Sequence, residues 1–173
     1  MPDDDIGIDI ASLDFSHIVA DAEAIRAVNP HRGAMVMLTA VVHLDVKNHL
    51  IVGYKDVGID EFWVPGHFPP MPVLPGVLMC EAAAQLCNWY AVGQKFVPTD
   101  RLMGLGGLED VRFRGIVRPG DRLIIAMKGL RVTTRMTKFA ARGYVPREGR
   151  FDPAFEAVVI GVPIAKAKEI ASA

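Results

Sequence analysis

The sequence predicts an α+β domain in which one long helix packs against an antiparallel β-sheet. The first observation is an apolar run that follows Pro75, lacks the alternation of a strand and continues to about Gly93. The second is a series of shorter Val-, Ile- and Leu-rich segments on both sides of this run, separated by turn residues. The chain has 173 residues, of which 51% are hydrophobic and 23% charged. This length and composition predict one globular domain with a substantial core.

Before the long helix, the chain is predicted to form an arm, a short helix and two strands. The arm is acidic and is expected to be loose, and the single domain then spans residues 16–173. The short helix is predicted by apolar spacing and ends before Asn29-Pro30, whereas the two strands are predicted by apolar composition. The ranges are 1–15 for the arm, 16–28 for the helix, and 34–45 and 50–57 for the strands.

After the long helix, the chain is predicted to contain only strands. Their ranges are 102–114, 123–131, 137–145 and 155–164. The first of them contains Gly104, Gly106 and Gly107, which indicate a β-bulge or a close backbone approach. Residues 146–153 are expected to form a polar loop, longer than a tight hairpin.

Charge is distributed unevenly along the chain. The net charge is −1, but residues 1–50 carry three Lys/Arg and eight Asp/Glu, whereas residues 101–150 carry twelve Lys/Arg and four Asp/Glu. The arginine-rich part favours an acidic partner by electrostatic steering, and a solvated sheet face explains it equally well. No nucleic-acid motif accompanies these arginines, so a nucleic-acid partner is not expected.

Several features predict a cytoplasmic, reduced protein. Glu81, Gln85 and Asn88 interrupt the longest apolar run, which is therefore no membrane span. The acidic N-terminus has no basic or apolar region typical of a secretory signal. Cys80 and Cys87 lie seven residues apart on the predicted helix, about 10 Å between Cα atoms, which is too far for a disulfide.

The stretch from Pro65 to Trp89 combines a stiff loop with the start of the long helix. Four prolines between His67 and Pro75 remove backbone donors and restrict the loop to extended conformations. Pro75 suits the first helical position. Within the apolar helix lies one carboxylate, Glu81, which costs several kcal/mol to bury unless it is paired or protonated.

His67 and Glu81 form a candidate acid–base pair. A histidine can act as a base near neutral pH, and a carboxyl group desolvated on an apolar helix is expected to have a raised pKa and to act as an acid. The helix start at Gly76 and Val77 presents free N–H groups that can polarise a carbonyl. A base, an acid and such donors specify β-elimination of a β-hydroxyl, or its reverse.

Structural explanations compete with this chemistry. A buried glutamate more often pairs with an arginine, and a loop histidine more often makes a local hydrogen bond. The remaining histidines lack metal-ligand spacing, so no metal site is expected. No nucleophile, dinucleotide or P-loop signature is present.

The stretch GHFPPMPVLPGVLMCEAAAQL resembles the signature of the (3R)-hydroxyacyl-[acyl-carrier-protein] dehydratases of fatty-acid synthesis. The similarity extends over roughly residues 20–165 and includes three further segments. These are Asn29-Pro30-His31-Arg32, the segment from Gly107 to Phe113, and the turn from Val117 to Asp121. The chain departs from the family pattern after Arg32, at Gly115-Ile116 and in the longer loop 145–155.

The resemblance implies a hot-dog fold, in which a curved antiparallel sheet wraps a long helix. It implies homodimers or trimers of dimers with active sites at the dimer interface, where His67 comes from one subunit and Glu81 from the other. His67 then removes the C2 proton, Glu81 protonates the leaving 3-hydroxyl, Gly76 N–H holds the thioester carbonyl and Gln85 orients Glu81. Phe68 and Val77 are expected beside the substrate.

The resemblance also implies an acyl carrier protein as partner and no cofactor beyond the carrier's phosphopantetheine arm. Arg112, Arg114 and Arg118 are expected to contact this acidic carrier. Two other functions remain open at this point: an acyl-thioester hydrolase of the same fold, and a non-catalytic subunit that binds the carrier. The sequence does not specify acyl chain length, isomerase activity or the lipid pathway.

Overall fold

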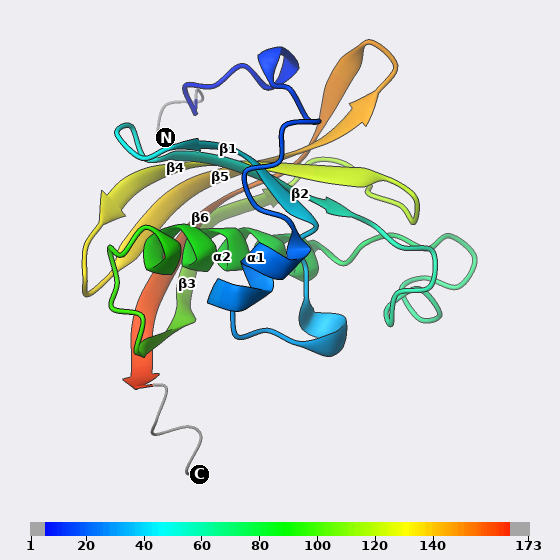
Figure 1. Ribbon diagram of the computed structural model, residues 1–173. Coiled ribbons are helices and arrows are strands. Elements are labelled where there is room, and N and C mark those ends of the chain that lie inside the picture. Colours follow the sequence, from blue (N-terminus) through cyan, green and yellow to red (C-terminus); the bar gives the residue numbers. More distant parts are fainter. Residues whose placement is uncertain (1–5, 167–173) are drawn as a thin grey trace.

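The computed structural model describes residues 6–166 of the chain as a curved antiparallel sheet wrapped around one long helix (Figure 1). This is the α+β, hot-dog arrangement predicted from the sequence. The six strands are ordered β1-β2-β4-β5-β6-β3, and every neighbouring pair is antiparallel. The helices are α1 (Ala22–Val28) and α2 (Gly76–Gly93), with 3-10 turns η1 (Ile10–Ser12) and η2 (Gly33–Met35). The strands are β1 (Ala40–Asp45), β2 (Leu50–Asp56), β3 (Arg101–Phe113), β4 (Arg122–Val132), β5 (Thr137–Arg147) and β6 (Arg150–Lys166).

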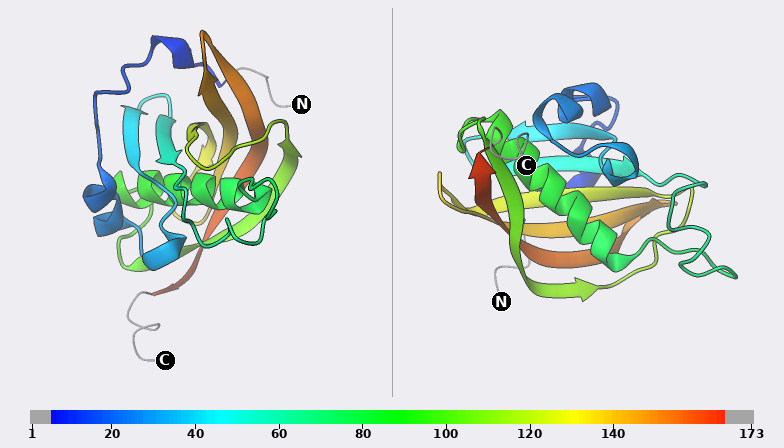
Figure 2. Two further views of the ribbon diagram at one scale, coloured as in Figure 1. Left: turned by 90° about the vertical axis from the view of Figure 1, so that its right-hand side faces the viewer. Right: turned by 90° about the horizontal axis from the view of Figure 1, so that it is seen from below.

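Helix α2 is the centre of the main core. It lies along the inner side of the curved sheet, and α1 lies beside it (Figure 2). Its second half is buried on nearly all sides, and Leu86 and Tyr90 are fully buried. Tyr90 packs edge-on against Phe139 of β5, with ring centroids 5.4 Å apart. A helix buried all round has no polar face, which is why its sequence shows an almost continuous apolar run.

The N-terminal arm is ordered where the structure describes it, and the expectation of a loose arm is wrong for residues 6–15. This segment lies on the opposite side of the sheet from α2 (Figure 1). Ile6 and Ile10 are buried in a second apolar cluster with residues of β1, β2 and β4. Phe15 stacks on Phe151 of the β5–β6 hairpin. The alternation of Ile6, Ile8 and Ile10 with polar residues marks the buried side of the arm.

Three segment boundaries differ from the sequence prediction. Helix α1 is shorter than predicted because Ala20 bridges to Val41 in an extended conformation, and Asp21 then caps the helix by accepting from Ala24 N at 2.8 Å. The strand predicted for residues 34–45 begins only at Ala40. The polar loop expected at residues 146–153 is wrong, since β5 and β6 continue to a two-residue turn at Glu148-Gly149.

The turn of this long hairpin depends on one glycine. Gly149 has a φ of +69°, in the left-handed region that glycine adopts without strain. Arg147, the last residue of β5, anchors the hairpin to the turn before β4. Its guanidinium donates two hydrogen bonds to the Asp121 carboxylate, at 2.7 and 3.0 Å. The departure from the family pattern at residues 145–155 is therefore a longer pair of strands, not a longer loop.

Docking of the arm is expected to stabilise the fold. Replacing Ile10 by Ala removes a side chain that is 8% exposed and should lower the free energy of unfolding by about 2 kcal/mol, through lost apolar burial. Ile18→Ala is the matched control, because that side chain is 42% exposed and its truncation should cost less than about 0.5 kcal/mol. Urea denaturation measures both values, and equal effects would show that the arm does not dock.

Candidate active site

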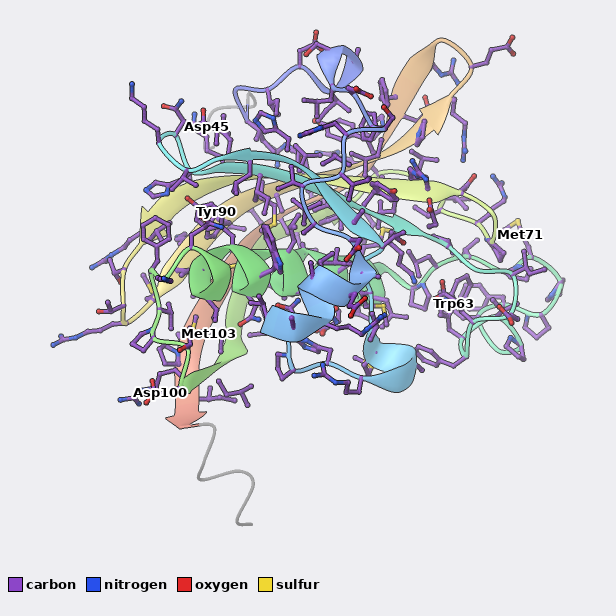
Figure 3. All side chains as sticks on the ribbon, in the orientation of Figure 1. Asp45, Trp63, Met71, Tyr90, Asp100 and Met103 are labelled. Atoms are coloured by element: carbon purple, nitrogen blue, oxygen red, sulfur yellow. The ribbon has the colours of Figure 1, made fainter. Side chains whose placement is uncertain are left out.

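The loop between β2 and α2 holds His67 in a defined orientation. Figure 3 shows Trp63 and Met71 in this loop, at the end of the molecule where α2 begins. His67 N donates to Trp63 O at 2.9 Å, and Val73 N donates to His67 O at 2.9 Å. These bonds and the prolines fix the loop backbone on both sides of the histidine.

The tautomer of His67 follows from its hydrogen bond. Nδ1 lies 2.8 Å from Val73 O. A carbonyl oxygen can only accept, so Nδ1 carries the hydrogen and Nε2 retains its lone pair. The ring also stacks on Phe68, with centroids 4.2 Å apart. Within residues 6–166, the bond from Nδ1 to Val73 O thus leaves Nε2 of His67 to accept a proton, as a general base must.

Glu81 lies on α2 with its carboxylate only partly accessible, at 23% exposure. Gln85, one turn further on, donates from Nε2 to Glu81 Oε1 at 2.9 Å. Gln85 is itself 1% exposed and held by two other bonds: Nε2 donates to Met35 O at 2.7 Å, and Oε1 accepts from Met37 N at 3.0 Å. This fully bonded amide is suited to the orienting role that the sequence suggested for Gln85.

The second partner of Glu81 is His31, which sequence reasoning missed. His31 Nε2 lies 3.3 Å from Glu81 Oε1. The segment Asn29-Pro30-His31-Arg32 resembles the family's N-terminal motif, but no role followed from it because His31 and Glu81 are 50 residues apart. That motif was the one signal from which the contact could have been found.

The expectation of a raised pKa for Glu81 is wrong. Burial does oppose its ionisation, but hydrogen bonding to His31 and Gln85, with the nearby His31 charge, outweighs burial and lowers the pKa below its usual range. The sequence showed the apolar neighbours on α2 and not the polar partners that arrive from elsewhere. Glu81 in the free chain is therefore ionised at neutral pH.

A small cavity of about 50 Å³ lies between α2, β3 and β6, and Glu81 and His31 both line it. Along α2 the wall continues through Ala84, Cys87 and Asn88, and β3 contributes Met103, labelled in Figure 3. His67 is not one of the lining residues. One chain therefore does not bring His67 and Glu81 into the same cavity.

The start of α2 is free of side-chain capping. Pro75 occupies the cap position and makes no side-chain hydrogen bond. Leu78 N and Met79 N donate to Pro75 O, which leaves the N–H groups of Gly76 and Val77 available to a ligand. Phe113 packs over Gly76 so closely that a Cβ there would lie 2.6 Å from the ring, which explains the glycine. Val77, in the first turn of α2, is 70% exposed, and Phe68, in the preceding loop, is 54% exposed.

The candidate carrier-binding arginines differ in their surroundings. Arg112 and Arg114, at the end of β3, share the Glu156 carboxylate of β6, at 3.5 and 2.5 Å. Arg118 lies in the turn before β4, where its backbone N donates to Asp121 Oδ2 at 2.8 Å, and its side chain is exposed. Part of the positive charge counted from the sequence is thus balanced within the sheet.

Other chemistry finds little support in residues 6–166. No group of three or more His, Cys, Asp or Glu side chains is placed there to hold a metal, and no helix in that range is long and apolar enough to cross a membrane. Cys80 and Cys87 are buried free thiols, and burial raises the pKa of each to about 11. Neither thiol is a nucleophile at neutral pH.

Comparison with known structures identifies the same fold. The dehydratase heterocomplex ApeI:P of Xenorhabdus doucetiae contains a chain that superposes with a TM-score of 0.59 and 21% identity, over 86% of this chain and 95% of that one. The virulence protein Cj0977 of Campylobacter jejuni superposes with a TM-score of 0.60 and 14% identity, over 89% of this chain and 97% of that one. At these identities the likeness concerns the fold alone.

Comparison of sequences identifies the family. Residues 29–149 match the model of the FabA-like domain. The 3-hydroxyacyl-[acyl-carrier-protein] dehydratase FabZ of Desulforamulus reducens is 36% identical over 128 residues, 74% of this chain and 89% of that protein. The enzyme of the same name from Nitratidesulfovibrio vulgaris is 37% identical over 128 residues, 73% of this chain and 82% of that protein. The chain therefore belongs to the FabA-like family, among the 3-hydroxyacyl-[acyl-carrier-protein] dehydratases.

Proposed function

We propose that this protein converts a (3R)-hydroxyacyl thioester on acyl carrier protein into the trans-2-enoyl thioester and water, in fatty-acid or related lipid biosynthesis. The observation that carries the mechanism is the orientation of His67. Its Nδ1 is committed to Val73 O, so its Nε2 is a base with a fixed direction. Family membership supplies the substrate class, and the geometry supports the roles that we propose for the residues.

In the reaction, His67 Nε2 removes the C2 proton and the electron pair forms the C2–C3 double bond. The C3–O bond breaks as the hydroxyl receives a proton from Glu81 and leaves as water. The thioester oxygen, on which negative charge develops, accepts from the N–H of Gly76 at the uncapped start of α2. Gln85 holds Glu81 in place, and Phe68 and Val77 border the substrate. No cofactor takes part beyond the phosphopantetheine arm of the carrier.

The active unit in this proposal is a homodimer, with larger assemblies built as trimers of dimers. Two observations support it. Glu81 lines a cavity that His67 does not reach within one chain. Strand β3 lies at the edge of the sheet and carries exposed apolar side chains, including Leu105 and Leu108. An edge of this kind is suited to pairing with a second copy, which would bring His67 of one subunit to Glu81 of the other.

We also propose that the protein acts in the cytoplasm.

Removal of either acid–base group should abolish most turnover. His67→Ala and Glu81→Gln are each expected to lower kcat/KM by about 100-fold or more. The rate is measured from the absorbance of the enoyl thioester that forms. His17→Ala and Glu23→Gln are matched controls at exposed positions and should retain wild-type rates. Wild-type protein that releases free thiol would be a thioester hydrolase, and carrier binding without turnover on any chain length would indicate a non-catalytic subunit.

A site shared between two subunits predicts complementation. Mixing inactive His67→Ala with inactive Glu81→Gln, under conditions that exchange subunits, should restore part of the wild-type rate. The restored activity comes from mixed dimers, in which one of the two sites holds both an intact His67 and an intact Glu81. Absence of any recovery, with mixed dimers demonstrated by mass spectrometry, would place both residues in one subunit.

Carrier recognition should depend on Arg118. Arg118→Glu is expected to raise KM for a carrier-borne substrate by about threefold to tenfold at low salt, with less effect at high salt. Arg150→Glu makes the same charge change at the hairpin tip, where Arg150 pairs with Asp152, and should leave KM unchanged. The same acyl group on a small soluble thiol should show no difference between the two variants, and an equal loss on both substrates would argue against a carrier contact.

A further inference from the structure

The segment that carries His31 is fixed on α2 by polar side chains. Asn29 is 3% exposed, its Nδ2 donates to Gln85 O at 2.9 Å, and its Oδ1 accepts from Asn88 Nδ2 at 2.6 Å. Gln85 in turn is bonded to the backbone of Met35 and Met37, after His31 in the chain. Bonds on both sides of His31 thus anchor it to the helix that bears Glu81.

The backbone at His31 is also braced locally. Arg32 Nη1 donates to Asn29 O and to His31 O, at 2.7 Å each. These bonds lie at or near the surface and add to the buried bonds of Asn29 and Gln85, which are the ones that specify the conformation of the segment. Their joint effect is to place the His31 imidazole 3.3 Å from the Glu81 carboxylate.

The imidazole of His31 has one nitrogen without a partner. Nδ1 is buried and makes no hydrogen bond within residues 6–166, while Nε2 faces Glu81 Oε1. An unpaired buried nitrogen costs free energy, and the fold retains it at a wall of the candidate active site. A side chain kept there for packing alone would not need an imidazole.

Few ionisable groups other than His31 and Glu81 line the cavity. Of the other residues that line the cavity, only Cys87 is titratable, and it stays a thiol with a pKa of about 11. The cavity walls from β3 and β6 carry no charge. The nearby Arg32 faces backbone carbonyls, and Gln85 is neutral. Within the described part of one chain, no third ionisable group that lines this cavity could take or supply a proton in the working range, and in the proposed dimer His67 of the other subunit joins the pair as the base.

We propose that His31 is a positioning residue that shares one proton with Glu81, so that the acid of the reaction is the His31–Glu81 pair. This proposal rests on the dehydratase function and extends it. Glu81 is ionised in the free chain and by itself has no proton to give. In the pair, His31 starts with hydrogen on both ring nitrogens and Glu81 starts ionised. The proton on His31 Nε2 passes to Glu81 Oε1, which leaves a neutral imidazole with its hydrogen on Nδ1, and Glu81 passes the proton on to the departing hydroxyl.

The proton count closes over one turnover. The C2 proton goes to His67 Nε2 and the C2–H electron pair forms the C2–C3 double bond. The pair loses one proton to the 3-hydroxyl as the C3–O bond breaks, and water leaves. His67 then holds one proton more and the pair one fewer, and exchange with solvent restores both. No oxidant, reductant or further reactant is needed.

Two variants separate proton sharing from simple hydrogen bonding. His31→Gln keeps an N–H donor near Glu81 but cannot carry the proton, and His31→Phe removes both properties. Both should lower kcat by about tenfold or more with KM nearly unchanged, because the proton supply and not substrate binding is lost. The alkaline limb of the pH–rate profile should move by about one pH unit or more toward acid, since a carboxyl alone loses its proton earlier than a pair that includes histidine. His17→Gln is the exposed control.

A second measurement does not depend on turnover. The carboxyl band of protonated Glu81 can be assigned by infrared difference spectroscopy against Glu81→Gln and followed with pH. In the proposed pair the shared proton lies mainly on His31 Nε2, so the Glu81 carboxyl band of wild type disappears at low pH even while the pair keeps its proton. In His31→Phe the burial of Glu81 is no longer offset by His31, so the pKa of this carboxyl should rise and its band should persist to higher pH than in wild type. Circular dichroism checks that each variant is folded.

The outcomes distinguish this inference from the proposed function. Wild-type kcat and pH profile in His31→Gln, or unchanged titration of Glu81 in His31→Phe, would overturn the pair. Reduced kcat in both variants together with the shifted band would establish it. A shifted band in a protein without dehydratase turnover would support the pair and refute the proposed function.

Discussion

The structure depends on the cost of holding one carboxylate on a helix that is otherwise buried. Glu81 cannot stay charged on α2 without partners, and α2 itself supplies only Gln85. The remaining polar groups come from the N-terminal segment, which crosses the helix and bonds to it through Asn29 and the backbone after η2. The path of residues 29–37 along α2 is thus linked to the environment of Glu81, because the bonds that fix this segment also hold the partners of the carboxylate.

Elements that rest on local patterns could be predicted from the sequence, and contacts between distant segments could not. The apolar run after Pro75 predicted α2 to within a residue, and turn residues located all six strands. The low pKa of Glu81 and the contact with His31 were missed, because a one-dimensional reading shows the neighbours of Glu81 on its helix and none of those that fold back onto it. The outer part of the β5–β6 hairpin was predicted as a loop over residues 146–153, because Pro153 and a polar composition are typical of loops.

The two halves of the candidate site are built by different means. The bonds of His67 itself, to Trp63 and Val73, are short in sequence, so its orientation is largely a local property. Glu81 is held by residues of α2 and of the distant segment 29–37, so its orientation requires these two parts of the chain to pack together. A substitution far from α2 can therefore disturb Glu81 while leaving His67 in place. General destabilisation of the fold is thus expected to lower activity before it changes the geometry of the loop around His67.

The docked N-terminal segment has a consequence for how copies of this protein can associate. Sheets of this kind can stack face to face, and an uncovered apolar face is what permits it. Here the outer face over β1, β2 and β4 is already occupied by Ile6, Ile10 and Phe15 of the same chain. A second sheet could stack there only by displacing this segment, whereas the proposed pairing of two copies through the edge strand β3 leaves the segment in place.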